Sequence, residues 1–114
     1  MGKWKHFTEQ EVAGLLDDVV YKLDRAREYF GSAIIITSGY RNPAENALAG
    51  GVSESAHTTG QAVDIRSNDP ISQKRLIWAL TLAGFRRMGA YDRHVHVDVD
   101  NTKPTPAFWT GESH

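Results

Sequence analysis

Histidine and aspartate alternate with valine in the segment His94-Val-His-Val-Asp98. Alternation along a β-strand places His94, His96 and Asp98 on one face and the valines on the other. The valine face belongs in a core, which leaves two imidazoles and a carboxylate within reach of each other. Taken alone, a histidine pair on a strand is more often a surface or hydrogen-bonded feature than a metal site.

A second segment, residues 55–64, adds another histidine and another carboxylate in the order Ser-x-His-x6-Asp. Val63 and Ile65 flank Asp64, so the aliphatic side chains point one way and the carboxylate points the other. An aspartate between two core-facing aliphatic residues is costly unless it is hydrogen-bonded, paired or bound to a cation. The chain has no cysteine, so any transition metal must be held by imidazole and carboxylate.

Zinc is the metal that this combination of donors predicts. A catalytic zinc site uses three protein ligands and keeps one position for water or substrate. Two histidines and one carboxylate from separate strands supply such a set, and zinc would then lower the pKa of water to about 7 and polarise a carbonyl. The sequence does not follow the helical His-Glu-x-x-His pattern of the commonest metalloproteases, which excludes that group.

Two helices are predicted to position these segments. A capping-box pattern over residues 8–11 precedes apolar residues at helical spacing, which predicts a helix over residues 8–30. Asp69 and Pro70 are typical of a helix start, and the second predicted helix ends near residue 84.

Short strands and a long loop account for most of the remaining chain. Strands are predicted for residues 33–37 and 62–65, and a hairpin for residues 85–91 and 94–99. Residues 40–56 form a loop of a length that often carries function, and Phe108 and Trp109 are expected to pack back on the domain. The predicted fold class is α+β, with two helices packed on a small, mainly antiparallel sheet.

Composition limits the class of protein. The 114 residues are 40% hydrophobic and 24% charged, with a net charge of −1, which predicts a single soluble domain over residues 1–114 and no nucleic-acid partner. No apolar run is long enough for a membrane span, and none follows the basic N-terminus as it would in a signal peptide. We therefore expect a monomer that is cytoplasmic as synthesised.

The pattern Ser-x-His-x-x-Gly-x-Ala-x-Asp over residues 55–64, followed by His-x-His, resembles the zinc D-Ala-D-Ala carboxypeptidase and L-Ala-D-Glu endopeptidase family. These murein peptidases share a core with lysostaphin-type enzymes and the hedgehog signalling domain. Further matching pieces are His6-Phe7, Glu11, residues 37–41, Asn46, Gly50-Gly51, Gly84-Phe85, Gly89 and Tyr91. The resemblance covers nearly the whole chain. It implies the α+β fold of that group and hydrolysis of a peptidoglycan stem peptide, by a D-Ala-D-Ala carboxypeptidase or an endolysin-type endopeptidase.

The resemblance also implies roles for single residues. The metal ligands of the family fall on His57, Asp64 and His96, which would bind Zn²⁺. His94 would handle a proton or steady the tetrahedral intermediate. Arg41 would bind a carboxylate or carbonyl of the substrate, although a loop arginine is usually solvated or tied to a nearby carboxylate.

The remaining candidates have two interpretations each. Ser55 is expected to hydrogen-bond to substrate or to a ligand, and Tyr91 either lines the site or packs in the core. Asp98 is either a salt-bridged edge residue or an acceptor that orients a ligand imidazole, and its place on the metal face favours the second. Arg93 stands where some relatives carry a glutamate as general base, so the base is not assigned.

Two other functions fit the same residues. The hedgehog domain shows that this core can hold zinc without catalysis, and a cytoplasmic dipeptidase could act on soluble D-amino-acid peptides. Retention of His94 beside three ligands favours catalysis, and a short chain has little room for the lids of a dipeptidase. The predicted lack of a signal peptide suits a phage-type lysis enzyme, which needs release or export to reach the cell wall. Five residues are expected to take no part, namely His6, His114, Trp4, Trp78 and Trp109.

Overall fold

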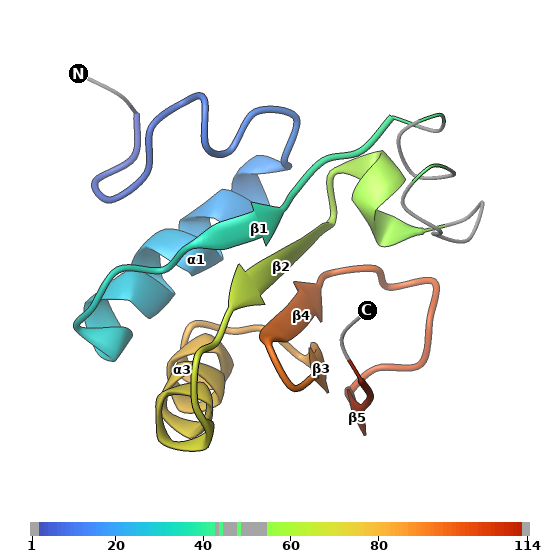
Figure 1. The fold of residues 1–114 in the computed structure, drawn as a ribbon. Helices are drawn as coiled ribbons and strands as arrows, with labels where there is room; N and C mark the ends of the chain where they lie inside the picture. The colour runs from blue at the N-terminus through green and yellow to red at the C-terminus, as the bar shows by residue number, and fades with distance from the viewer. Residues whose placement is uncertain (1–2, 43, 45–47, 49–54, 113–114) are drawn as a thin grey trace.

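The computed structural model describes residues 3–42, 44, 48 and 55–112 (Figure 1). Asn46, Gly50, Gly51 and His114 lie outside these residues. The elements in chain order are α1 (Asp17–Phe30), β1 (Ile36–Ser38), the 3₁₀ helix η1 (Ala56–Thr59), β2 (Ala62–Arg66), α3 (Pro70–Leu82), β3 (Arg87–Ala90), β4 (His94–Asp98) and β5 (Ala107–Thr110). None of the described helices is long and apolar enough to cross a membrane.

The strands form one sheet in the order β1-β2-β4-β3-β5. The first four are antiparallel to their neighbours, and β5 pairs with β3 in parallel. Helices α1 and α3 pack against each other and cover one face of the sheet (Figure 1). The predicted α+β class with two helices on a mainly antiparallel sheet is confirmed.

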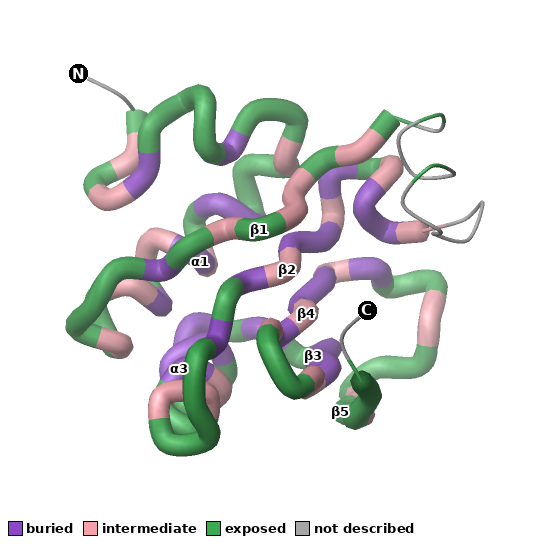
Figure 2. The backbone as a smooth tube through the Cα atoms, viewed as in Figure 1, coloured by how far each residue is buried: buried purple, intermediate pink, exposed green. Residues whose placement is uncertain are grey.

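The core lies between the sheet and the two helices. Val63 of β2 and Val97 of β4 are fully buried there, together with Leu23 of α1 and Leu80 of α3 (Figure 2). Burying one such side chain stabilises the fold by about 1.5–3 kcal/mol. Because successive strand residues point to opposite faces, this burial directs Asp64, His94 and His96 to the uncovered face.

The first helix begins much later than the sequence predicted. The capping-box contacts exist, with the Thr8 amide donating to Glu11 and the Glu11 amide donating to Thr8, but they close turns and not an α-helix. Gly14 explains the difference, because its φ of +81° lies in the left-handed region and a Cβ there would lie 2.6 Å from the Tyr40 ring. The helix therefore starts only at Asp17.

The other predicted elements differ mainly at their ends. Strand β1 is shorter than residues 33–37 and starts at Ile36, next to an irregularity in its pairing with β2. Helix α3 starts at Pro70 as predicted, and the Asp69 side chain accepts from the Ser72 amide at 2.9 Å. The tail packs back as expected, and its residues 107–110 form a fifth strand that was not predicted.

Candidate metal centre

One row of residues across the sheet supplies two of the three predicted metal ligands. Asp64 of β2 lies opposite His96 of β4, and Ser38 of β1 lies opposite Asp64 on its other side. Gly89 of β3 lies opposite His96, and Trp109 of β5 lies opposite Gly89. Paired residues point to the same face of a sheet. The five residues, which we call the site row, therefore share the face that the helices leave uncovered.

The third predicted ligand comes from helix η1, just before β2. Ser55 caps this helix by accepting from the His57 amide at 3.2 Å. The buried His57 ring lies 2.8 Å through Nδ1 from the carbonyl oxygen of Gly39. A carbonyl only accepts, so Nδ1 carries a hydrogen and Nε2 is the nitrogen left to bind a metal. That Nε2 lies 3.5 Å from an oxygen of Asp64.

The His96 ring lies between two carboxylates. Its Nδ1 is 2.9 Å from Asp64 and its Nε2 is 2.8 Å from Asp98. Asp98 is 2% exposed, and its other oxygen accepts from Arg87 Nε at 2.7 Å and from the Asp100 amide. A ligand imidazole usually donates its outer N–H to such an acceptor, which sets its orientation. Asp98 occupies this position for His96.

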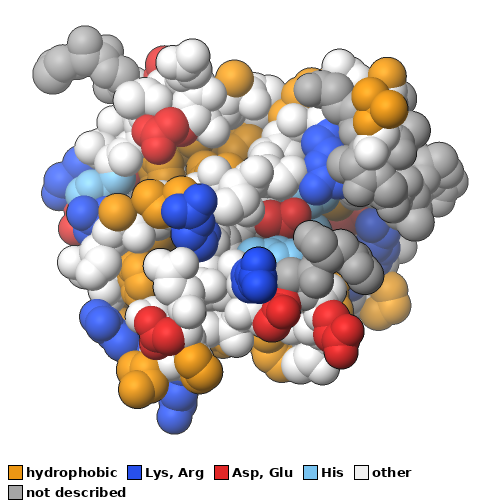
Figure 3. Space-filling model, viewed as in Figure 1, with side chains coloured by type: hydrophobic (Ala, Val, Ile, Leu, Met, Phe, Trp, Pro, Cys, Tyr) orange, Lys and Arg blue, Asp and Glu red, His pale blue; other side chains and the backbone are white. Residues whose placement is uncertain are grey.

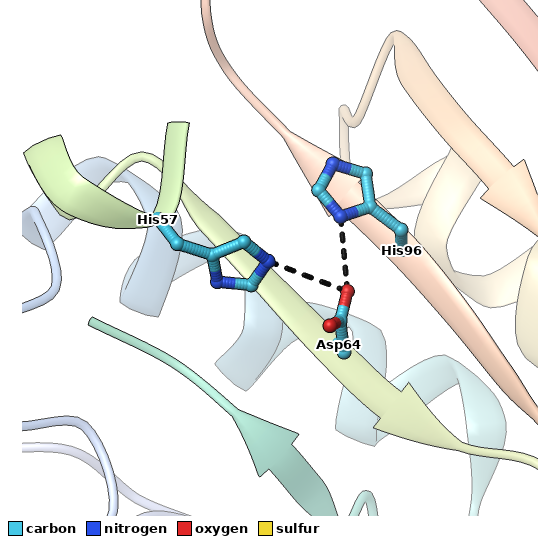
Figure 4. Close-up of side chains that lie close together, drawn as sticks. All are labelled: His57, Asp64 and His96. Carbon is cyan, nitrogen blue, oxygen red and sulfur yellow. Dashed lines mark hydrogen bonds and ion pairs between the residues drawn. The ribbon is translucent and has the colours of Figure 1, made fainter. Parts of the chain in front are cut away.

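The inner atoms of His57, Asp64 and His96 converge on one point (Figure 4). One donor atom from each residue lies within 4.8 Å of the other two. The two nitrogens lie 3.5 and 2.9 Å from the same Asp64 oxygen, close to the roughly 3.4 Å expected between ligand atoms of a tetrahedral zinc site. The outer nitrogen of each ring is already hydrogen-bonded. The donors and their surroundings therefore fit a metal ion.

Electrostatics keep Asp64 ionised. Burial raises the pKa of Asp64, but hydrogen bonds and charge from His57 and His96 outweigh burial and hold it well below its usual value. Burial likewise lowers the pKa of His96, but Asp64 and Asp98 outweigh this effect and raise it above the usual value. The carboxylate is thus ready to bind a cation, whereas the raised pKa of His96 means that a proton competes with a cation for its ring nitrogen.

Arg41 lies beside the three residues. Its Nε donates to Ser38 at 2.8 Å, and Nη2 lies 3.5 Å from the second oxygen of Asp64. Its backbone amide donates to the His57 carbonyl at 3.1 Å. Its side chain is 20% exposed. Arg41 is thus tied to a carboxylate, as the plainer interpretation expected, and still reaches solvent beside it.

His94 and Tyr91 lie at the next position along the uncovered face. Their rings are stacked, with centroids 4.4 Å apart and planes 7° from parallel. Burial lowers the pKa of His94, and the like charges of His96 and His57 add to this effect against the pull of nearby aspartates. A neutral imidazole at neutral pH is the form that can accept a proton. Arg93 lies in the turn that precedes β4.

Comparison with known proteins identifies the family. The sequence model of the peptidase M15 family matches residues 3–100. The chain belongs to the peptidase M15 family. It is therefore a peptidase, a class of hydrolase. Among solved structures, the L-Ala D-Glu endopeptidase ChiX of Serratia marcescens has a similar fold, with a TM-score of 0.64 and 21% identity over 80% of this chain and 84% of that chain. No curated protein matches the chain.

Sequence reasoning missed three features around the centre of this M15 peptidase. Trp109 was expected to take no part in the site, yet its ring lies 5.7 Å from the His96 ring. Arg87, 8% exposed, pairs with Asp98 and was not singled out. The Gly39 carbonyl orients His57. Only Arg87 carried a signal, because a charged residue inside a predicted strand calls for a buried partner.

The uncovered face of the M15 peptidase brings charge and imidazole to the surface together. In the space-filling view, histidine atoms and acidic atoms lie side by side near the middle of this face, with Lys and Arg atoms close by (Figure 3). The side chains of Asp64 and His96 are 15% and 17% exposed, whereas that of His57 is 5% exposed. A small molecule approaching from solvent would therefore meet Asp64 and His96 first.

Proposed function

We propose that residues 1–114 act as a single zinc-dependent peptidase domain that hydrolyses a peptide bond in peptidoglycan stem peptides. The observation that carries this proposal is the convergence of the donor atoms of His57, Asp64 and His96 within 4.8 Å. Two imidazoles and one carboxylate are a usual ligand set for catalytic zinc in hydrolases. The similar fold of ChiX, an L-Ala D-Glu endopeptidase, supports the substrate class.

The three metal ligands and His94 would each have a separate role in hydrolysis. Zinc bound by the three ligands would supply an activated water and polarise the scissile carbonyl. His57 and His96 would present their inner nitrogens in fixed directions, because the Gly39 carbonyl and Asp98 hold the outer ones. His94, whose pKa is lowered by burial, would accept the proton that the attacking water loses and return it to the leaving amine.

Arg41 would bind the substrate. Its guanidinium lies 3.5 Å from Asp64 and is partly exposed, so a substrate group close to the ligands is within its reach. A planar guanidinium can bind a carboxylate through two parallel hydrogen bonds. It can equally bind a peptide carbonyl. Binding of a terminal carboxylate would fit a carboxypeptidase, and binding of a peptide carbonyl would fit an endopeptidase.

The metal is tested directly. Purified protein should contain about one zinc per chain by elemental analysis, and chelation should abolish hydrolysis. His57→Ala and Asp64→Ala should each lose the metal, whereas Trp78→Phe on the exposed face of α3 should keep it. Protein that neither contains zinc nor takes it up on addition would refute the proposal.

The role of His94 is tested separately from metal binding. His94→Ala should keep its zinc and its fold but lose about 100- to 10,000-fold in hydrolysis rate, the usual value of general acid–base assistance. An unchanged rate with zinc still bound would remove His94 from the reaction.

The bond that is cut follows from two experiments. Purified peptidoglycan is digested and the fragments are identified by mass spectrometry: released D-alanine indicates a carboxypeptidase, and a cut after L-alanine an endopeptidase. Activity on soluble D-amino-acid dipeptides alone would favour the dipeptidase alternative.

If Arg41 binds a terminal carboxylate, peptides with an amidated C-terminus should be poor substrates, and Arg41→Lys should lose little further hydrolysis rate on them. Zinc content is measured in parallel, because Arg41 contacts Asp64.

A further inference from the structure

Four aromatic rings on the uncovered face form one connected chain. The His96 ring lies 5.7 Å from the Trp109 ring, and Trp109 Nε1 donates to the Tyr91 hydroxyl at 2.9 Å. Tyr91 stacks on His94 at 4.4 Å. His94 and His96 are two residues apart on β4 and share a face. This series of rings therefore starts at His96, a proposed metal ligand, and ends at His94, the imidazole that we propose to move the proton.

The sheet is built so that Trp109 can reach this position. Gly89 lies between His96 and Trp109 in the site row, and a Cβ on Gly89 would lie 2.2 Å from Trp109 Nε1. The indole therefore occupies the space above the glycine. Strand β5 is fixed beside β3 by its parallel pairing and by the Gly111 amide, which donates to the Ala90 carbonyl at 3.0 Å.

The hydrogen bond between Trp109 and Tyr91 constrains the Tyr91 ring at its far end. A tyrosine ring is fixed at one end by its Cβ, and a hydrogen bond at the hydroxyl prevents the ring from swinging. With the Tyr91 ring held, the His94 imidazole stacked on it is held in a plane nearly parallel to that ring, at 7°. Trp109 itself is further held by the Arg87 guanidinium, which lies over its ring, 5.1 Å from the centroid.

We propose that Trp109 is a positioning residue that fixes the plane of the His94 imidazole through Tyr91. The inference rests on the proposed function, in which His94 handles a proton. The family match ends at residue 100, so it assigns nothing to Trp109. Orientation of a catalytic group matters for rate, since a displacement of about 1 Å can lower it by on the order of 100-fold.

Two substitutions remove this hydrogen bond from opposite ends. Trp109→Phe keeps an aromatic ring but loses the N–H, and Tyr91→Phe keeps the stacking ring but loses the hydroxyl. Each should lower kcat by about tenfold, a part of the 100-fold or more expected for loss of His94, with KM and zinc content unchanged. The double variant should lose no more than either single one, because both break the same bond. Trp78→Phe is the matched control, since Trp78 is an exposed tryptophan on α3.

A second readout does not need hydrolysis. In proton NMR of the metal-free protein, the Tyr91 ring should shift the His94 ring protons upfield, because the two rings are stacked. Trp109→Phe should reduce this shift and Trp78→Phe should leave it unchanged. Unchanged His94 shifts in Trp109→Phe, or losses in kcat that add in the double variant, would overturn the inference. If the shifts change as expected but the wild-type protein cuts no peptide, the positioning holds and the proposed reaction is wrong.

Discussion

Replacing Asp98 by asparagine should weaken zinc binding although Asp98 is not a proposed ligand. The Asp98 carboxylate is 2% exposed and accepts from three donors, with one oxygen 2.8 Å from His96 Nε2 and the other 2.7 Å from Arg87 Nε and 3.1 Å from the Asp100 amide. An asparagine side chain of the same shape has only one accepting oxygen, because its amide nitrogen donates. It can therefore satisfy His96 or Arg87, but not both.

Either choice lowers the affinity for zinc. If the amide oxygen turns to Arg87, the amide nitrogen faces the N–H of His96, and the imidazole loses its orienting partner. If the oxygen turns to His96, the imidazole keeps a partner but loses the negative charge that makes it more basic. Loss of such an acceptor typically weakens metal affinity by about 10- to 100-fold, which corresponds to about 1.4–2.7 kcal/mol.

The assay is competition with a chromophoric chelator at fixed pH, with the thermal midpoint of each variant recorded to exclude unfolding. Asp100→Asn is the matched control, because Asp100 is also buried and hydrogen-bonded, to Thr102, but does not touch a ligand. Equal zinc affinities for Asp98→Asn and Asp100→Asn would refute the view that Asp98 orients His96.

Three further results are expected. Zinc affinity should fall as the pH is lowered from about 8 to 5, because the carboxylates raise the pKa of His96 and its proton competes with the metal; a chelator titration at each pH measures this, and a flat profile would contradict the ligand assignment. A hydrogen bond from Lys5 lowers the pKa of Glu28 to about 2, below its unfolded value, so this contact stabilises the fold at neutral pH and its effect disappears as the pH falls from about 4.5 to 2. Glu28→Gln should therefore lower the thermal midpoint at pH 7 but leave it unchanged at pH 2. Leu23→Ala should lower the free energy of unfolding in urea by about 2–5 kcal/mol, whereas Leu82→Ala, at a site 45% exposed, should change it by less than about 0.5 kcal/mol.

The alternation of aliphatic and polar residues along the strands predicted which side chains of the candidate site face away from the core. The valines around His96 and the aliphatic residues around Asp64 indicate which side chains face the core and which do not, because that property is local to each strand. The pairing of Asp64 with His96 depends on register between strands 32 residues apart, which no local pattern contains. The long-range contacts of Trp109 and Arg87 were missed for the same reason.

The error in the first helix has a similar origin. Residues 8–30 do carry helical spacing and a capping box, and both signals are local. Gly14 adopts a left-handed conformation because the Tyr40 ring, from a distant segment, packs where a Cβ would be. Local propensity therefore predicted a continuous helix that a tertiary contact interrupts.

The pairing of β2 with β4 has a consequence for how mutations accumulate in this fold. A shift of one residue in this register would turn Asp64 toward the helices and expose Val63, since neighbouring residues face opposite sides. Such a sheet would lose its core and its donor atoms in the same step. A molecule that has buried Val63 and Val97 has therefore already brought Asp64 opposite His96. Single-residue insertions within either strand should accordingly never yield a folded but metal-free protein. Insertions in the exposed turn around residues 101–102 should instead yield a protein that folds and keeps its metal-binding residues together.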